Sequence, residues 1–159
     1  MKITLQNSGK RFSREWIFRN LNYEFLPENI YAITGPNGSG KSTLLQVISG
    51  ALLLNEGTCK WQLTNINIEP DDVHLYISIA APYIELIEEM TATEFLFFHA
   101  SFKKYIHNFS VTDILQQAGL SNAADKQIRL FSSGMKQRLK LAQAIFSDVS
   151  LIVLDEPCT

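Results

Sequence analysis

The segment GPNGSGKST at residues 35–43 places the strongest constraint on what this chain can fold into. It fits the pattern GxxxxGK[ST], in which a glycine-rich loop joins a strand to the start of a helix. The flanking sequence agrees, because residues 30–34 are mostly apolar and β-prone, and residues 44–48 are largely apolar before Gly50, a fitting helix end. The pattern therefore predicts an α/β fold in which this loop connects a strand over residues 30–34 to a helix.

The chemistry of this loop favours a phosphate ligand. Its glycines let backbone N–H groups point inward, and the positive end of the following helix attracts an anion. Lys41 adds a charge for the β- and γ-phosphates, and Ser42 offers its hydroxyl to Mg²⁺. A solvated glycine-rich turn is the alternative, and the strand-to-helix context argues against it. The candidate phosphate-binding residues are Gly35, Asn37, Gly38, Ser39, Gly40, Lys41, Ser42 and Thr43.

A second part of the same site is predicted at residues 151–156, LIVLDE. Four consecutive apolar residues predict a strand covered on both faces, since a half-exposed strand would alternate. Asp155 and Glu156 then follow its C-terminal end, where parallel sheets bind ligands. Asp155 suits Mg²⁺, and Glu156 suits the water that attacks a γ-phosphate. An exposed acidic turn before Pro157 is the alternative.

Other elements follow from periodicity and helix caps. Alternation of apolar and polar residues predicts strands over residues 20–25, 59–63 and 74–80. Capping-box spacing predicts two helices, one from Thr91 to about residue 107 and one from Ser110 to about residue 119.

A length of 159 residues, 46% of them hydrophobic, predicts one domain. Within it we assign residues 1–82 and 129–159 to an α/β core and residues 83–128 to an inserted helical subdomain. The formal charge of −2 gives no general affinity for nucleic acid, so an acidic ligand must be held locally. The sequence has no apolar run that could span a membrane, which predicts a soluble intracellular protein. Cys59 and Cys158 have no metal-ligand spacing around them and are predicted to be free thiols.

Residues 131–138, FSSGMKQR, begin a helix with apolar residues at helical spacing from Met135 to Ile145. Alone, these serines and the glycine are ordinary helix caps. Taken in order, residues 35–43, 131–138 and 151–157 resemble the Walker A, signature and Walker B motifs of ATP-binding cassette (ABC) transporter ATPase subunits.

The resemblance covers nearly the whole chain. It implies a P-loop NTPase with a RecA-like core, an N-terminal antiparallel β-subdomain and an inserted α-helical subdomain. It also implies a subunit that binds and hydrolyses ATP to power a membrane ABC transporter, in the cytoplasm and peripheral at the inner face of the membrane. The implied partners are a second ATPase subunit in a head-to-tail dimer and a transmembrane permease, with no nucleic acid.

Site residues follow from the same resemblance, with ATP and Mg²⁺ as ligands. Lys41 and Glu156 match the catalytic positions, and Ser42 and Asp155 match the metal ligands. Ser132 and Gly134 match the groups that contact the γ-phosphate held by the partner subunit, and the helix dipole behind them also favours an anion. An aromatic residue upstream of Walker A stacks on adenine in the family. Phe12 matches best by its offset from Leu21 and Trp16 is second, whereas local packing is the alternative for both.

Two motifs depart from the family pattern. The signature reads FSSGM where the commonest form is LSGGQ, although Ser132 and Gly134 are kept. The Q-loop glutamine falls at Ala81 or Pro82, neither of which can bind a metal through its side chain. Tyr83 and Glu85 are weak substitutes.

The largest departure is at the end of the chain, where the D-loop and the following histidine-bearing strand are missing. We therefore expect an incomplete domain of a longer ABC ATPase, inactive or weakly active as the 159-residue form. Strands over residues 30–34 and 151–154 would lack their shared neighbour, and direct pairing of the two would count against this hypothesis. A nucleotide-binding module without turnover and a soluble non-transport ABC ATPase are the alternative functions.

Overall fold

The computed structural model describes residues 1–157 and divides into two compact units. The first comprises residues 1–77 and is called the N-unit below. The second starts at residue 78 and is called the C-unit. Residue 158, the second of the two predicted free thiols, lies outside the described residues, whereas Cys59 is a free thiol as predicted.

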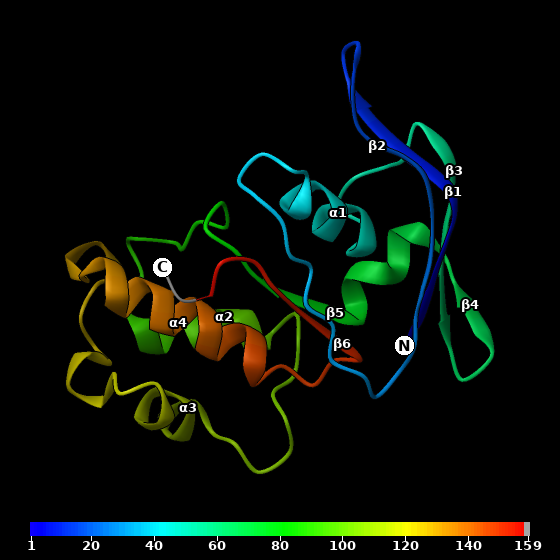
Figure 1. The fold of residues 1–159 in the computed structure, drawn as a ribbon. Coiled ribbons are helices and arrows are strands. Elements are labelled where there is room, and N and C mark those ends of the chain that lie inside the picture. The colour runs from blue at the N-terminus through cyan, green and yellow to red at the C-terminus, as the bar shows by residue number, and fades with distance from the viewer. Residues whose placement is uncertain (158–159) are drawn as a thin grey trace. The chain divides into compact units, whose positions relative to one another are not determined.

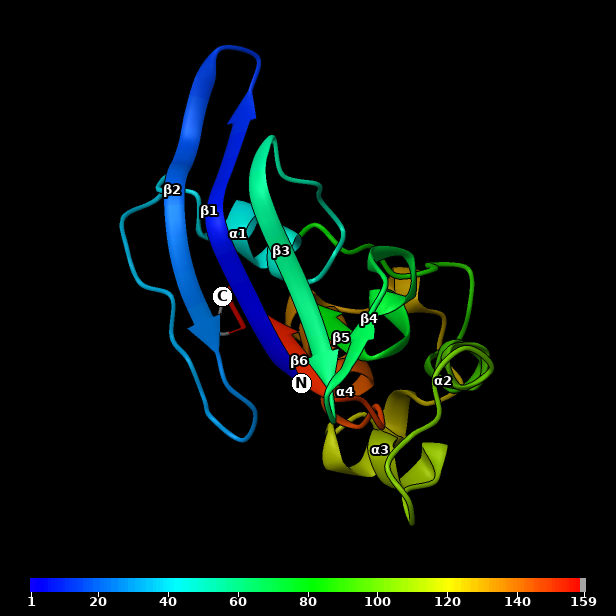
Figure 2. The same ribbon diagram turned by 90° about the vertical axis from the view of Figure 1, so that its right-hand side faces the viewer.

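The N-unit is built on a four-stranded antiparallel sheet in the order β2-β1-β3-β4 (Figure 2). Strand β1 has a ladder on each side, with β2 and with β3, and these ladders supply partners for its backbone groups. The strands predicted over residues 20–25 and 59–63 are confirmed within longer strands. The bounds are β1 Lys2–Phe12, β2 Glu15–Phe25, β3 Glu56–Leu63 and β4 Ile66–Ile68.

Helix α1, Lys41–Ile48, packs on one face of this sheet (Figure 2). Val47 and Ile48 are buried at its end, together with Ile3 from β1. The indole N–H of Trp61 in β3 donates a 2.7 Å hydrogen bond to the carbonyl of Ile48. Helix and sheet are therefore joined by apolar burial and by one buried hydrogen bond that also satisfies an end-of-helix carbonyl.

The strand predicted over residues 30–34 does not form. Residues 29–36 are irregular, and the side chain of Ile30 is fully exposed. Among the described residues, no backbone ladder joins this segment to another strand. A β-prone sequence becomes a strand only where a neighbour completes its hydrogen bonds, so the local pattern was insufficient here.

Over its described residues, up to 157, the C-unit combines three α-helices with a two-stranded sheet (Figure 1). The N–H of Asp155 donates a 2.9 Å hydrogen bond to the carbonyl of Ala80, which joins the C-terminal ends of β5 and β6. Strands that meet at the same end run parallel. The bounds are β5 Ile77–Ala80, α2 Ala92–Ala100, α3 Val111–Gln117, α4 Ser133–Ile145 and β6 Leu151–Leu154.

The helices of the C-unit enclose a continuous apolar core. Leu96, Ile114 and Leu139, one from each helix, are fully buried in it. Complete capping boxes begin α2 at Thr91 and α3 at Ser110, as the sequence predicted. Gly119, with a φ of 65°, lies just after α3 as a helix stop.

Two sequence predictions in the C-unit and at its border need correction. The strand predicted over residues 74–80 is shorter, because residues 70–75 form a 3-10 helix and β5 starts at Ile77. Helix α2 ends at Ala100 and not near residue 107, since the N–H of Ile106 donates to the carbonyl of Phe146 at 2.8 Å. Tertiary pairing thus replaces the helical bonds of this segment.

Strand β6 is also less covered than predicted. Val153 is buried, whereas Ile152 and Leu154 are 39% and 38% exposed. The alternation shows one covered face, so the apolar run does not indicate burial on both sides. A four-residue apolar run therefore does not by itself distinguish a strand covered on one face from a strand covered on both.

Candidate functional site

The phosphate loop lies in the N-unit and leads directly into α1 (Figure 1). Gly38 and Gly40 have φ values of 79° and 90°, which other residues adopt only with strain. The carbonyl of Gly40 accepts the first helical bond, 2.9 Å from the N–H of Leu44. The N–H groups of residues 41–43 belong to the first turn, so the helix itself provides no carbonyl acceptor for them, and they lie at its positive end. This geometry suits an anion.

Lys41 lies over the loop that precedes it. Its Nζ donates to the carbonyl of Gly35 at 2.9 Å and to the carbonyl of Pro36 at 3.0 Å. These two hydrogen bonds hold the Lys41 ammonium over the loop. Its positive charge therefore lies beside the N–H groups at the start of α1, where the ammonium can also donate to a phosphate oxygen.

Gly40 also fixes the loop against the sheet. A Cβ built on this glycine would lie 2.4 Å from Cγ2 of Ile17 in β2, much closer than two carbon atoms allow. The backbone of the loop therefore approaches β2 as closely as only glycine permits. Nothing in the sequence singles out Ile17, because its place in the alternating pattern of β2 is that of any half-buried strand residue.

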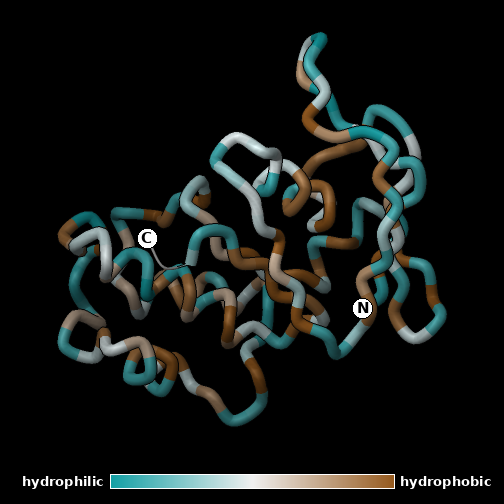
Figure 3. Tube along the Cα trace, viewed as in Figure 1, coloured by the Kyte–Doolittle hydropathy of each residue, from teal (hydrophilic) through white to brown (hydrophobic). Residues whose placement is uncertain are grey.

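The two aromatic candidates for adenine stacking differ in their surroundings. The side chain of Phe12 is 49% exposed, and the Lys10 ammonium lies 5.3 Å from its ring centroid. The ring of Trp16 carries two guanidinium groups, Arg11 at 5.4 Å and Arg19 at 4.5 Å. Phe12 is thus the more accessible ring. The hairpin tip beside it is hydrophilic (Figure 3).

The two acidic candidates lie in the C-unit, directly after β6. Asp155 is only 5% exposed, and its N–H is bonded to Ala80. Glu156 is exposed and has a φ of 46°, a left-handed conformation that is uncommon outside glycine and asparagine. The two carboxylates therefore leave the strand in different environments, one enclosed and one facing solvent.

The signature segment begins α4 in the C-unit. Ser132 is the N-cap residue, and its Oγ accepts a 3.3 Å hydrogen bond from the N–H of Met135. A Cβ on Gly134 would meet no atom within 4 Å, so open space lies over the first turn. Ser132 and Gly134 are thus brought together at an open helix N-terminus, as the motif predicts.

The two positions expected for the Q-loop, Ala81 and Pro82, follow β5, and the backbone carbonyl of each accepts a hydrogen bond. Ala81 is fully buried, and its carbonyl accepts from the N–H of Ile84 at 3.1 Å. The carbonyl of Pro82 accepts a 3.3 Å hydrogen bond from Nζ of Lys140 in α4. Three residues earlier in the same helix, Nε2 of Gln137 donates to the carbonyl of Pro157 at 3.3 Å. Helix α4 therefore contacts the segments that follow both strands.

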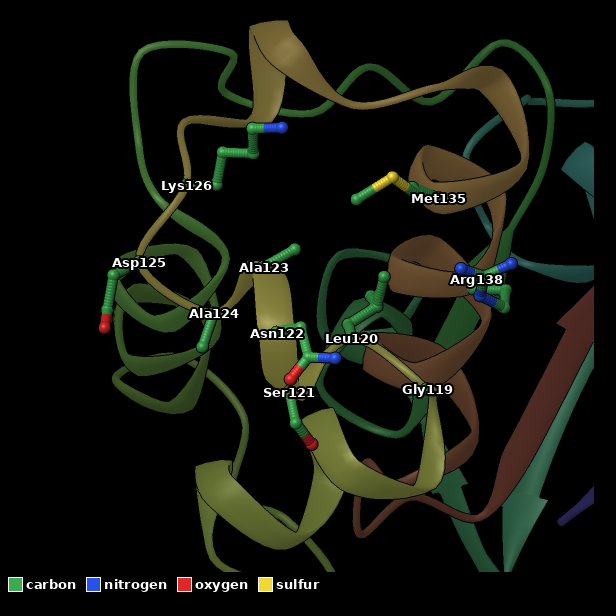
Figure 4. A pocket seen from close by; sticks show the side chains of 10 residues that line it. All are labelled: Gly119, Leu120, Ser121, Asn122, Ala123, Ala124, Asp125, Lys126, Met135 and Arg138. Atoms are coloured by element: carbon green, nitrogen blue, oxygen red, sulfur yellow. The ribbon is translucent and has the colours of Figure 1, made fainter.

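A hollow of about 700 Å³ lies beside the first turns of α4 (Figure 4). Residues 119–126 line most of it, and Met135 and Arg138 of α4 complete the wall. The side chains of Lys126 and Met135 extend toward the open space, whereas the carboxylate of Asp125 points away from it (Figure 4). This hollow is lined entirely by the C-unit and contains none of the predicted site residues.

Within residues 1–157, His, Cys, Asp and Glu side chains do not gather in groups of three or more that could hold a metal ion. A cation bound mainly by phosphate and water needs fewer protein ligands than that, so the donors Ser42 and Asp155 remain chemically suitable. In the same range, none of the helices has both the length and the apolar character needed to cross a membrane.

Fold and loop together define the class, a P-loop NTPase of the ABC ATPase type, and solved structures agree. The ATP-binding cassette MJ0796, in a dimeric post-hydrolysis state bound to ADP and Pi, is 26% identical, with a TM-score of 0.78. The match covers 98% of this chain and 74% of that one. The profile of the ABC transporter family matches residues 18–159, so this chain belongs to that family.

Curated relatives agree with this assignment. The uncharacterized ABC transporter ATP-binding protein YybJ of Bacillus subtilis (strain 168) is 32% identical over 98% of this chain and 71% of its own length. The cytochrome c biogenesis ATP-binding export protein CcmA of Vibrio vulnificus (strain YJ016) is 33% identical over 90% of this chain and 70% of its own. Other relatives are longer, and the chain spans 40% to 52% of three of them.

Proposed function

We propose that this chain is the ATP-binding and hydrolysing subunit of an ABC transporter. The observation that carries the proposal is the phosphate loop, whose left-handed glycines, helix N-terminus and folded-over Lys41 form one anion-binding surface. Family membership supports ATP as the nucleotide, since the MJ0796 cassette holds ADP and Pi.

Within the N-unit, the loop would bind the triphosphate and Phe12 would stack on the adenine. The amides at residues 41–43 and the Lys41 ammonium supply donors and charge for phosphate oxygens. The ring of Phe12 is half-exposed and offers surface for a base, whereas two guanidinium groups already lie near the ring of Trp16. The other proposed contacts are Gly35, Asn37, Gly38, Ser39, Gly40, Ser42 and Thr43.

Magnesium would be held by the Ser42 hydroxyl and the Asp155 carboxylate, and it would neutralise charge on the phosphates. Glu156 would accept a hydrogen bond from the attacking water. Its left-handed backbone fits that role, because strained conformations of non-glycine residues concentrate at functional sites.

The partners proposed are a second ATPase subunit and a transmembrane permease. Ser132 and Gly134 would contact the γ-phosphate of the partner subunit's ATP, and their open helix N-terminus fits an anion. The dimeric state of MJ0796 and the export role in the name of CcmA support such an assembly. We place the subunit in the cytoplasm, peripheral at the inner face of the membrane, with no nucleic-acid partner.

Calorimetric titration with Mg·ATP tests the proposal. Lys41→Ala should weaken binding about tenfold or more, because a charged donor to phosphate is lost. Lys60→Ala, at an exposed position of β3, is the matched control and should bind as the parent does. Equal affinities for the Lys41 variant and the control would refute the phosphate-loop assignment.

Turnover needs a separate measurement, by phosphate release. If the parent chain releases phosphate, Glu156→Gln should keep Mg·ATP binding and stop the release, whereas Glu89→Gln, at another exposed glutamate of the C-unit, should change neither. A parent chain that binds Mg·ATP but releases no phosphate would support the alternative of a nucleotide-binding module without turnover.

A further inference from the structure

We propose that Lys10 is a positioning residue for adenine recognition, which acts by holding the ring of Phe12. The inference rests on the proposed function, since it assumes that Phe12 stacks on the base. It assigns a role to a residue that no sequence motif singles out, and all of its evidence lies within the N-unit.

Lys10 is an unusual lysine because it is only 9% exposed. Its Nζ donates a 2.7 Å hydrogen bond to the carbonyl of Leu53 and lies 5.3 Å from the ring centroid of Phe12. Residues 10 and 12 are two positions apart in β1, so their side chains share one face of the strand. The hydrogen bond to Leu53 therefore holds the ammonium in place, and its positive charge lies near the ring of Phe12.

Further hydrogen bonds tie this part of β1 to the segment that follows α1. The N–H of Asn55 donates to the carbonyl of Gly9 at 2.9 Å, and Oδ1 of Asn55 accepts from the N–H of Arg11 at 2.9 Å. Together with the bond from Lys10 to Leu53, they fasten both sides of residue 10. Hydrogen bonds thus connect the strand that carries Phe12 to the segment that directly follows α1, the helix that starts at the phosphate loop.

The chemistry gives Lys10 a specific effect on base stacking. A half-exposed phenylalanine can adopt several rotamers, and fixing one of them costs conformational entropy when a base binds. A cation near the ring face favours one orientation before binding and leaves the exposed part of the ring for the purine. Loss of the ammonium should therefore weaken recognition of the base and spare recognition of the phosphates.

The test compares a nucleotide with a ligand that has no base. Dissociation constants are measured by calorimetry for Mg·ATP and for magnesium tripolyphosphate, with the 159-residue chain and its Lys10→Met variant. We expect Lys10→Met to weaken Mg·ATP by about threefold to tenfold and to leave tripolyphosphate unchanged. Lys60→Met, an exposed lysine of the neighbouring strand, is the matched control and should change neither constant.

A double-mutant cycle then separates positioning from a general effect on the fold. In the Phe12→Leu background, Lys10→Met should have no further effect on Mg·ATP, because the ring through which it acts is gone. Lys10→Arg, which keeps a cation, should retain most of the affinity and also tests the idea if Lys10→Met does not fold.

Three results would overturn the inference. One is unchanged Mg·ATP affinity in Lys10→Met. Another is an equal loss of affinity for Mg·ATP and for tripolyphosphate. The third is the same loss of Mg·ATP affinity in the presence and in the absence of the Phe12 ring. These results require a parent chain that binds both ligands, whereas a parent that binds neither overturns the proposed function as well.

Discussion

The Cβ that an alanine would add at position 40 falls 2.4 Å from Cγ2 of Ile17. This close approach makes β2 a wall of the phosphate loop and links the shape of the loop to the packing of the N-unit. The left-handed φ of 90° at Gly40 adds a second, independent requirement for glycine.

Gly40→Ala should therefore lower both stability and nucleotide binding. Strain at a positive φ and the clash with Ile17 together should reduce the free energy of unfolding by about 2–4 kcal/mol. Urea denaturation followed by far-ultraviolet circular dichroism measures the change. Gly38→Ala is the control, because it has a left-handed φ of 79° but nothing within 4 Å of the added carbon.

Adding Ile17→Ala to Gly40→Ala should recover part of the nucleotide binding, because it removes the atom in the way. If Gly38→Ala and Gly40→Ala were equally destabilising, steric contact with β2 would play no part in the requirement for glycine.

Trp61→Phe should destabilise the N-unit by about 1–2 kcal/mol. The variant keeps most of the apolar contact but leaves the carbonyl of Ile48 without its buried donor. Thermal and urea unfolding measure the loss. Trp16→Phe removes an indole whose ring lies against two arginines, and it should cost less. A larger loss from Trp16→Phe than from Trp61→Phe would contradict the contribution expected of the hydrogen bond from Trp61 to Ile48.

Ser110→Ala should lower the free energy of unfolding at pH 7 by about 1 kcal/mol, since it removes an N-cap. The side-chain and backbone hydrogen bonds from Ser110 lower the pKa of Asp113 below its ordinary 3.8. A lowered folded-state pKa stabilises the protein above pH 3.8 and ceases to do so as the pH falls through the folded value.

The difference between parent and Ser110→Ala should consequently shrink below pH 3.8. Urea unfolding at pH 7, 5 and 3 measures it, and Ser121→Ala, an exposed serine that caps no helix, serves as control. A difference that does not change with pH would exclude Asp113 from the cap's contribution.

His99 should make the C-unit sensitive to acid. Burial and the positive charge of Lys103 lower the pKa of His99 from 6.5 to about 4, and Nδ1 has no hydrogen-bond partner among the described residues. The unfolded chain therefore binds more protons than the folded one between those values, and stability falls as the pH drops from 6.5 toward 4.

His99→Phe can retain the stacking on Tyr105 and removes the titrating group. The slope of unfolding free energy against pH between 6.5 and 4 should become smaller, as measured by urea unfolding. His107→Phe, at an exposed position, is the matched control. An unchanged slope in the His99 variant would place the acid sensitivity elsewhere.

Cys59 should react slowly with thiol reagents in the native protein. Burial raises the pKa of its thiol to about 12, so the nucleophilic thiolate is scarce at pH 8. In a Cys158→Ser variant, labelling by a chromogenic disulfide should be slow in buffer and fast in urea. Equal rates in both would mean that the site opens readily without denaturant.

Local signals in the sequence predicted the parts of this structure that depend on near neighbours. Capping boxes at Thr91 and Ser110 and the apolar spacing in α4 place three helix starts correctly, because each cap is closed by residues three positions away. The glycine pattern at residues 35–43 likewise predicted a loop that leads into a helix.

Long-range pairing was harder to predict. Residues 30–34 have the composition of a strand but no hydrogen-bonded neighbour, and residues 104–106 leave the helical path to bond with residues 146–148. The roles of Lys10 and Ile17 are set by residues more than 20 positions away, Leu53 and Gly40. A single sequence offers no local signal for such contacts.

The two hydrogen bonds from α4 have a mechanical consequence. Gln137 and Lys140 are three positions apart and so lie on one side of the helix, and they grip the carbonyls of Pro157 and Pro82. Helix α4 thus links the segment that follows β6 to the segment that follows β5. Rotation of α4 about its own axis would stretch both hydrogen bonds, so we expect a movement of Ser132, at the start of α4, to be accompanied by a movement of the turn after Asp155.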